Sequence, residues 1–235
     1  MSKLFRRRPL REYVDLSSYA HYARKQLGIP CMSSDNALRN LVDIDAAFHA
    51  RDIPYCLSDG TLLGAFREGQ FIRHDYDTDI YVPADGFDPG VLLDLRRRGF
   101  HIRKCLGFPD DGMYWALNRS KVTTDVFFLY PRDSGLYLSA YADFRGETAK
   151  WIDYLVPKFD YGWIELLGHQ FRAPKEPEVL LRCSYGDSWR TPDKNWHYAI
   201  DPPNAAPRSE RLNLAASQKA IAEYLQSRTG VPWVW

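Results

Sequence analysis

The sequence contains no run of about 18 apolar residues, the minimum that lets an α-helix span a bilayer, so no transmembrane helix is expected. It also contains no internal repeat and no low-complexity linker. Neither sign of charge is in excess, because 31 Lys and Arg stand against 30 Asp and Glu among 235 residues. A nearly neutral protein has no overall attraction to polyanions, so we expect no nucleic-acid partner.

Cysteine is scarce and scattered along the chain. The four cysteines are Cys31, Cys56, Cys105 and Cys183, and none of them forms a C-x-x-C pair. This spacing argues against a structural zinc site, which uses closely paired ligands. We therefore expect free thiols, most of them buried.

A signal peptide is not expected either. The basic segment at the start of the chain carries Arg6, Arg7, Arg8 and Arg11, but no apolar stretch follows it. We interpret this segment as a solvated tail, with a weak contact to anionic lipid or to a phosphorylated acceptor as the alternative. Because no apolar anchor is present, we expect a cytoplasmic protein, with binding at the periphery of a membrane as the alternative.

The composition favours one packed domain, since 45% of the residues are hydrophobic and 14% are aromatic. Apolar periodicity and capping residues predict helices over residues 35–51, 62–67, 88–99, 177–185 and 209–228. Strands or extended chain are predicted at 54–57, 71–72, 78–82, 113–118 and 122–130. We expect strands and loops over residues 137–171 and an irregular segment marked by prolines over 192–207. Helices and strands alternate, so the expected fold class is α/β or α+β.

A turn between the first predicted strand and the next helix carries Gly60 and Thr61. Glycine lets the backbone approach a phosphate closely, and the start of a helix offers unpaired N–H groups and a positive dipole end. The Thr61 hydroxyl can add a hydrogen bond. The alternative is an ordinary helix cap without a ligand.

Three aspartates alternate with other residues in Asp75-Tyr76-Asp77-Thr78-Asp79. In an extended chain Asp75, Asp77 and Asp79 point to one face, where close carboxylates repel each other unless a cation lies between them. Oxygen ligands of this kind suit Mg²⁺ or Mn²⁺. The alternative is a solvated acidic loop, but the apolar residues at 80–82 place the acids at the start of a core strand and favour a site.

A further acid, Asp125, lies within the apolar strand predicted at 122–130. A charge in such a strand is costly to bury without a partner. A metal ion shared with Asp77 and Asp79 would supply that partner, and an ion pair with an arginine or lysine is the alternative. A metal held by two acidic strands beside a phosphate-binding turn is typical of phosphate-transfer chemistry.

Residues 60–80, GTLLGAFREGQFIRHDYDTDI, resemble the signature of the LicD and fukutin family, which is approximately GTLLGAxRxxGFIPWDDDID. Residues 185–192, YGDSWRTP, resemble the downstream YGxxWxxP element of the same family. Together with the strand of Asp125, the resemblance extends over roughly residues 38–192. The long first motif is specific, and the second motif follows in the expected order.

The resemblance implies a nucleotidyltransferase-like fold, a small mixed β-sheet flanked by helices. It also implies a phosphotransferase of glycan modification and polysaccharide biosynthesis. Such an enzyme moves phosphocholine or an alditol or sugar phosphate from a CDP-linked or other nucleotide-activated donor to a glycan or glycolipid hydroxyl. On this basis we expect an N-terminal extension (1–33), a catalytic domain (34–200), and a proline-rich segment with a C-terminal helix packed on that domain (201–235).

By position, Asp77 and Asp79 match the metal-binding acids of the family and Asp125 its third acid. The phosphate-side turn is matched by Gly60, Thr61, Gly64 and Arg67. For Arg67, a phosphate clamp and a salt bridge to Glu68 or Asp75 are both open.

Two departures from the family pattern concern the substrate. Arg73 and His74 replace a Pro-Trp pair, and Tyr76 replaces one aspartate of the acidic run. His74 is a candidate substrate-binding residue and proton acceptor, with a surface or capping histidine as the alternative. Two other functions stay open: nucleotidyl transfer from a nucleoside triphosphate to a small molecule, and non-catalytic binding of a nucleotide or glycan.

Overall fold

The structure, a computed structural model, describes residues 31–193 and 196–233. The expected N-terminal extension and its arginines therefore lie almost entirely outside the described residues. The helices are α2 (Ser34–His49), α3 (Asp59–Glu68), α4 (Val91–Arg97), α5 (Pro177–Tyr185) and α6 (Leu214–Thr229). The strands are β1 (Cys56–Leu57), β2 (Asp77–Pro83), β3 (His101–Phe108), β4 (Asp111–Arg119), β5 (Val122–Arg132), β6 (Gly135–Arg145), β7 (Thr148–Val156), β8 (Tyr161–Leu166), β9 (His169–Pro174) and β10 (Ala205–Asn213).

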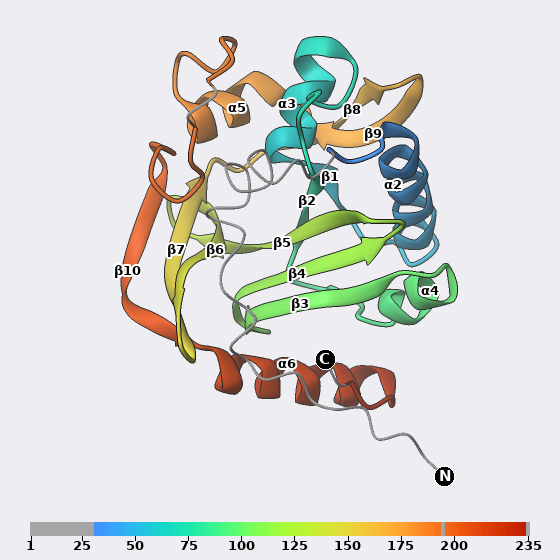
Figure 1. Cartoon of the computed structure of the whole chain (residues 1–235), viewed down its shortest axis with the longest axis vertical. Coiled ribbons are helices and arrows are strands. Elements are labelled where there is room, and N and C mark those ends of the chain that lie inside the picture. Colours follow the sequence, from blue (N-terminus) through green and yellow to red (C-terminus); the bar gives the residue numbers. More distant parts are fainter. Residues whose placement is uncertain (1–30, 194–195, 234–235) are drawn as a thin grey trace.

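One mixed sheet of eight strands organises the molecule, in the order β1-β2-β5-β6-β7-β10, with β4 also on β5 and β3 on β4 (Figure 1). The long strand β5 joins its two halves. Residues 122–129 of β5 lie beside β2 and β4, and residues 130–132 pair with β6. The short strands β8 and β9 form a separate hairpin. The mixed sheet with flanking helices confirms the expected α/β class.

The core covers one face of the first half of this sheet. Val126 and Phe128 of β5 are fully buried, and the ring of Trp115 on β4 lies 4.8 Å from that of Phe128. Helix α2 adds Leu41 and Ile44 to the same core. Because side chains alternate along a strand, the residues between these positions face away from the core.

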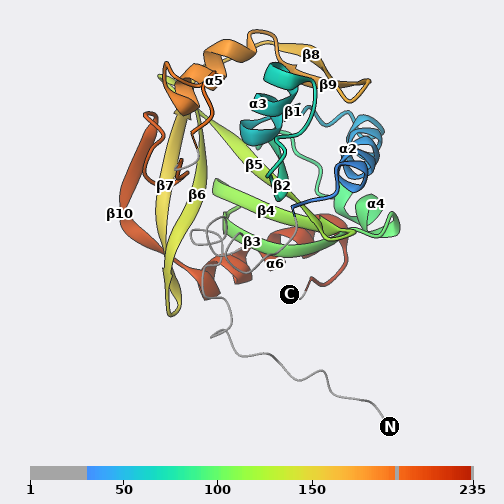
Figure 2. The same ribbon diagram turned by 45° about the horizontal axis from the view of Figure 1, so that its top comes forward.

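Helix α6 lies on the opposite side of the molecule from α3, α5 and the β8–β9 hairpin. Figures 1 and 2 show α6 along β3 on one side, and α3, α5 and the β8–β9 hairpin together on the other. Among the described residues no helix is both long enough and apolar enough to cross a membrane. The four cysteines are free, as expected, but only Cys56 and Cys105 are buried, whereas Cys31 is exposed and Cys183 is half-buried.

Most predicted elements are present with shifted ends. Helix α3 begins at Asp59 rather than at 62, and α4 begins at Val91 after a turn. Residues 71–72 lie outside any strand. Strand β3 was not predicted, because Arg103, Lys104 and Gly107 interrupt its apolar pattern.

The predicted helix over 209–228 is wrong at its start. Strand β10 continues through Asn213, whose side chain then caps α6 by accepting a hydrogen bond from the Ala216 N–H (2.9 Å). Leu212 pairs with Ala149 of β7 and is buried. Pairing with a strand far away in the sequence therefore overrides the local helical pattern at 209–213.

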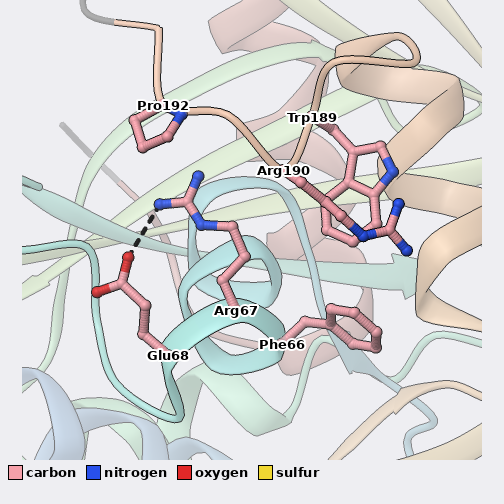
Figure 3. A pocket seen from close by; sticks show the side chains of 6 residues that line it. All are labelled: Phe66, Arg67, Glu68, Trp189, Arg190 and Pro192. Carbon is pink, nitrogen blue, oxygen red and sulfur yellow. Dashed lines mark hydrogen bonds and ion pairs between the residues drawn. The ribbon is translucent and has the colours of Figure 1, made fainter.

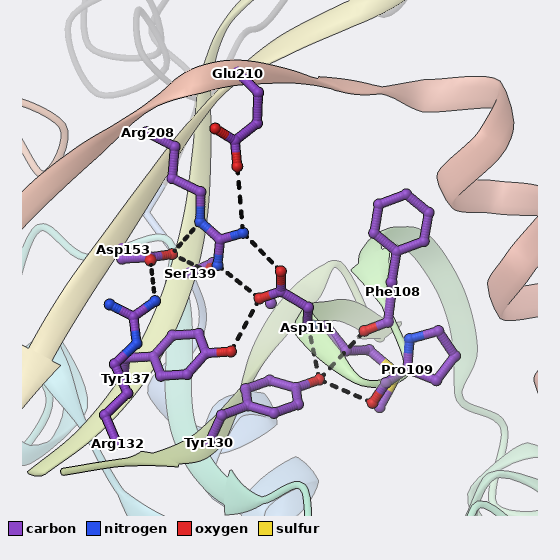
Figure 4. A network of polar contacts seen from close by, with 12 residues as sticks. Phe108, Pro109, Asp111, Tyr130, Arg132, Tyr137, Ser139, Asp153, Arg208 and Glu210 are labelled. Carbon is purple, nitrogen blue, oxygen red and sulfur yellow. Dashed lines mark hydrogen bonds and ion pairs between the residues drawn. The ribbon is translucent and has the colours of Figure 1, made fainter.

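A polar network fastens β10 to the sheet (Figure 4). The Arg208 guanidinium donates to both carboxylate oxygens of Asp111 on β4, at 2.6 Å each, and to Asp153 on β7 at 3.0 Å. Asp153 also accepts hydrogen bonds from Arg132 and Ser139, both at 2.7 Å. The Asp153 side chain is only 5% exposed, so the two arginines satisfy a charge that is costly to bury.

We expect Asp153→Asn to lower the free energy of unfolding by about 3 kcal/mol, because it leaves two guanidinium groups facing an uncharged amide. Urea denaturation measures this change. The matched control is Asp143→Asn, which removes a more exposed acid paired with Arg145 and Arg211 and should change stability far less. Equal losses in the two variants would contradict the role given to the network.

Candidate active site

The acids predicted as a site lie on the face of the sheet that the core does not cover. Strands β2 and β5 run parallel, and their register pairs Asp79 with Asp125 and Asp77 with Thr123. All three acids therefore share one face. On the opposite, buried face the hydroxyls of Thr78 and Thr124 lie 2.8 Å apart, which fixes the same register.

This face forms the floor of a cavity of about 770 Å³. Three parts of the chain form its walls. Tyr154 lines it from the second half of the sheet, Gly60 from the start of α3, and Tyr185 from the end of α5. Five acids line it near the floor and the start of α3, namely Asp59, Asp75, Asp77, Asp79 and Asp125, and Asp193 and Asp201 line it from the segment after α5. A cavity of this size with converging polar groups is typical of a small-molecule site.

The start of α3 holds Asp79 in place. The backbone N–H of Asp79 donates to the Thr61 hydroxyl oxygen (2.8 Å), and the Thr61 N–H lies 3.4 Å from the Asp79 carboxylate. A Cβ at Gly60 would lie 2.9 Å from an Asp75 oxygen and 3.3 Å from an Asp79 oxygen. The missing side chain at Gly60 thus lets two carboxylates approach the turn. The predicted phosphate contact at this turn stays a prediction.

The other residues of the predicted phosphate turn have different positions. Arg67 lines the rim of the cavity and forms an ion pair with Glu68 at 3.0 Å, opposite Trp189 and Arg190 (Figure 3). Gly64 is buried and is not among the cavity-lining residues. A Cβ there would lie 2.5 Å from the Gln70 carbonyl oxygen, so Gly64 serves a close approach between α3 and the loop before the acids.

His74 and the tryptophans considered from the sequence are also placed. His74 is exposed and lines the cavity, so the structure leaves its substrate-binding role as a prediction. Trp115 is buried in the core, and Trp189 is buried beside the rim. Trp196 lines the cavity and its ring lies 4.9 Å from that of Tyr185.

Burial and mutual repulsion raise the pKa values of the acids in the cavity. Burial, with the charge of Asp77 next, raises the pKa of both Asp75 and Asp79 well above the usual aspartate range. The same two causes raise the pKa of Asp125 to about 7. Burial alone raises the pKa of Asp59 to about 6.

The hydrogen-bond partners of these acids include uncharged groups. The Tyr114 hydroxyl donates to Asp125 at 3.0 Å, and the Tyr81 hydroxyl donates to Asp59 at 3.0 Å. The charges of Lys104 and Arg103 also act on Asp125 and oppose the rise of its pKa, so the alternative of a basic partner for this acid stays open. The raised pKa values indicate that protons neutralise part of the charge of this cluster when no cation is bound.

The donor set suits Mg²⁺ or Mn²⁺, since both ions prefer carboxylate oxygens. Within residues 31–193 and 196–233, however, no three acids, histidines or cysteines are arranged so that all could bind one ion. At least one carboxylate would have to turn for three of them to bind one cation. The metal role of Asp77, Asp79 and Asp125 stays a prediction that the shared face supports.

Several cavity residues were not among the predicted site residues. Asp59 enters the site because α3 starts earlier than the sequence pattern indicates, and Tyr185 because α5 ends at the cavity. Tyr114, Arg103 and Lys104 come from β4 and β3. Their positions follow from strand register, for which the sequence carries no local signal.

Comparisons with known proteins agree on one family. A model described as LicD/FKTN/FKRP, nucleotidyltransferase domain, matches residues 52–176. The ribitol-5-phosphate transferase FKTN of Mus musculus is 28% identical over 156 residues, 66% of this chain and 33% of that protein. FKTN of Homo sapiens is 27% identical over the same shares. The chain thus spans about a third of the length of these relatives.

Among solved structures, the antibiotic-resistance factor ANT(2'')-Ia in solution aligns with a TM-score of 0.44 and 15% identity, covering 84% of this chain and 91% of that chain.

We expect Gly64→Ala to destabilise the protein, although alanine is the better helix former by about 1 kcal/mol. The added methyl group would press on the backbone of Gln70 and Ile72, which cannot move away as a flexible side chain can. Thermal unfolding measures the sign. A stabilised variant would show that α3 and the loop are not in close contact.

In metal-free protein, we expect Asp125→Asn to become relatively more stable than wild type as pH rises from 5 to 8. The unfolded carboxyl loses its proton near about pH 3.9, whereas the folded one keeps it to about pH 7, so the wild type loses stability between these values as pH rises. Asparagine keeps an acceptor oxygen for Tyr114 and cannot ionise. Urea denaturation at several pH values with a chelator gives the difference, and a constant difference would contradict the raised pKa.

Proposed function

The chain belongs to the LicD/FKTN/FKRP family, and on this basis we propose that it is a metal-dependent phosphotransferase. It would move a phosphate-linked group from a nucleotide-activated donor to a hydroxyl group. The observation that carries this proposal is the register that pairs Asp79 with Asp125 on the open face, with Asp77 beside them. Two acidic strands that meet in a cavity are suited to hold a cation against a phosphate.

In this proposal Asp77 and Asp79 hold Mg²⁺ or Mn²⁺. The ion would neutralise charge on the phosphate and polarise it for attack. Asp125, oriented by the Tyr114 hydroxyl, completes the ligand set or accepts the proton of the acceptor hydroxyl. Thr61 keeps the backbone of Asp79 fixed, so that catalysis rests on positioning and charge neutralisation.

The phosphate of the donor's nucleoside monophosphate would lie at the Gly60 turn. The start of α3 supplies backbone N–H groups there, and Arg67 lies at the adjoining rim, with a guanidinium geometry that suits phosphate. His74 lines the same cavity and is a candidate contact for the acceptor. A cation and these donors together would offset the repulsion between the phosphates and the acids.

We infer that the donor is CDP-linked and that an alditol phosphate is transferred to a glycan or glycolipid. This rests on the family and on the FKTN relatives, whose printed name is ribitol-5-phosphate transferase. Nucleotidyl transfer from a nucleoside triphosphate is the alternative on the same site. The cytoplasmic location expected from the sequence stays a prediction.

We expect CMP and CDP to raise the melting temperature only when Mg²⁺ or Mn²⁺ is present, because a ligand of the folded state stabilises it by mass action. Asp77→Asn should abolish this shift. In an assay with a CDP-linked alditol donor, the same change should lower turnover by at least about 100-fold, since a metal contributes several kcal/mol.

The control is Asp110→Asn, which removes an exposed acid that does not line the cavity. A melting shift with ATP or CTP alone would favour nucleotidyl transfer. No shift with any nucleotide in folded protein, or normal turnover in Asp77→Asn, would refute the proposal.

A further inference from the structure

Two cations share the open face of the sheet with the acids. The strand pairings place Asp79 of β2, Asp125 of β5, Ala116 of β4 and Lys104 of β3 in one row across four strands. All four line the cavity. Because alanine has a short side chain, the floor between Asp125 and Lys104 stays open.

A β-bulge brings a second cation to this face. The register between β3 and β4 shifts from Ile102, paired with Leu117, to Lys104, paired with Ala116, which leaves Arg103 as the extra residue. Ile102 packs against the core, whereas Arg103 and Lys104 both line the cavity. A bulge re-aims side chains in this way, and bulges are frequent next to active sites.

The contacts of the two cations place them at the margin of the acidic cluster. A terminal nitrogen of Arg103 lies 3.4 Å from the hydroxyl oxygen of Thr123, the residue that pairs with Asp77 across β2 and β5. The Lys104 ammonium lies 4.2 Å from the centre of the Phe144 ring on β6. The cations therefore lie on the β4 side of β5, whereas Gly60 of α3 lies against Asp75 and Asp79, on the β2 side of the acids.

We propose that Arg103 and Lys104 form a phosphate-binding subsite on the side of the acids away from Gly60. The proposal deepens the proposed function and rests on it. A phosphate near five carboxylates is repelled unless cations face it, and a guanidinium with an ammonium supplies several charged donors. The phosphate belongs either to the donor, beyond its nucleoside monophosphate, or to the acceptor molecule.

Calorimetric titration in Mg²⁺ tests the subsite with three probes: CMP, CDP, and glycerol 3-phosphate added to the CMP complex. In Arg103→Gln/Lys104→Gln we expect unchanged CMP affinity. We expect a loss of at least about tenfold for CDP if the phosphate is the donor's, or for glycerol 3-phosphate if it is the acceptor's. Arg103→Lys/Lys104→Arg keeps both charges and should retain most of the affinity.

The matched control is Lys158→Gln/Lys175→Gln, which removes two exposed cations that do not line the cavity. The subsite is refuted if the control variant loses as much affinity for CDP or glycerol 3-phosphate as Arg103→Gln/Lys104→Gln does. It is refuted too if the cavity variant loses as much affinity for CMP as for the other two probes. It is also refuted if Arg103→Gln/Lys104→Gln binds both CDP and glycerol 3-phosphate as tightly as the wild type does. A wild type that binds no glycerol 3-phosphate, and binds CDP no more tightly than CMP, would refute it as well. Thermal unfolding confirms that each variant is folded.

These outcomes separate the subsite from the proposed function. If the wild type binds neither CMP nor CDP in Mg²⁺, the nucleotide-donor function fails. Titration with glycerol 3-phosphate alone then still reports on Arg103 and Lys104. If CMP binds and requires Asp77 while the cavity variant behaves as wild type, the proposed function stands and the subsite fails.

Discussion

Two strands that are distant in the sequence, β2 and β5, run parallel, and their register sets Asp79 directly beside Asp125. A shift of β2 by one residue would turn Asp77 and Asp79 into the core and bring Thr78 to the cavity, and a shift of β5 would do the same to Asp125 and Thr124. The buried faces of both strands prevent either shift, because Ile80, Val126 and Phe128 require the apolar side. The hydrophobic core therefore fixes the geometry of the acidic cluster on the opposite face.

The same arrangement accounts for the residues in the first turns of α3. Thr61 accepts a hydrogen bond from the backbone of Asp79, and Gly60 leaves space for the carboxylates of Asp75 and Asp79. Gly64, one turn further along, lets α3 lie against the loop that leads to the acids. Three residues of one short motif thus act on the position of the acids, whether or not they also contact a ligand.

The sequence supports the prediction of Asp77, Asp79 and Asp125 because alternation along a strand is a local property. It also supports the α/β class, since the helical and strand patterns are strong. It does not predict β3 or the strand character of 209–213, where pairing with distant strands decides the conformation. Arg103 and Lys104 belong to this second group, because only the bulge in β3 turns both toward the cavity.

The choice of hydrogen-bond donors around the acids bears on their chemistry. Asp125 is held by the hydroxyl of Tyr114, and Asp59 by that of Tyr81, so neither contact cancels a charge. At β10, by contrast, the fold buries Asp153 by pairing it with Arg132 and Arg208. The protein thus neutralises a structural aspartate with its own arginines and gives Asp125 and Asp59 of the cavity uncharged hydroxyl donors. Because uncompensated carboxylates are costly to bury, their neutralisation requires protons or a bound cation, and a bound cation would couple ligand binding to the stability of this face.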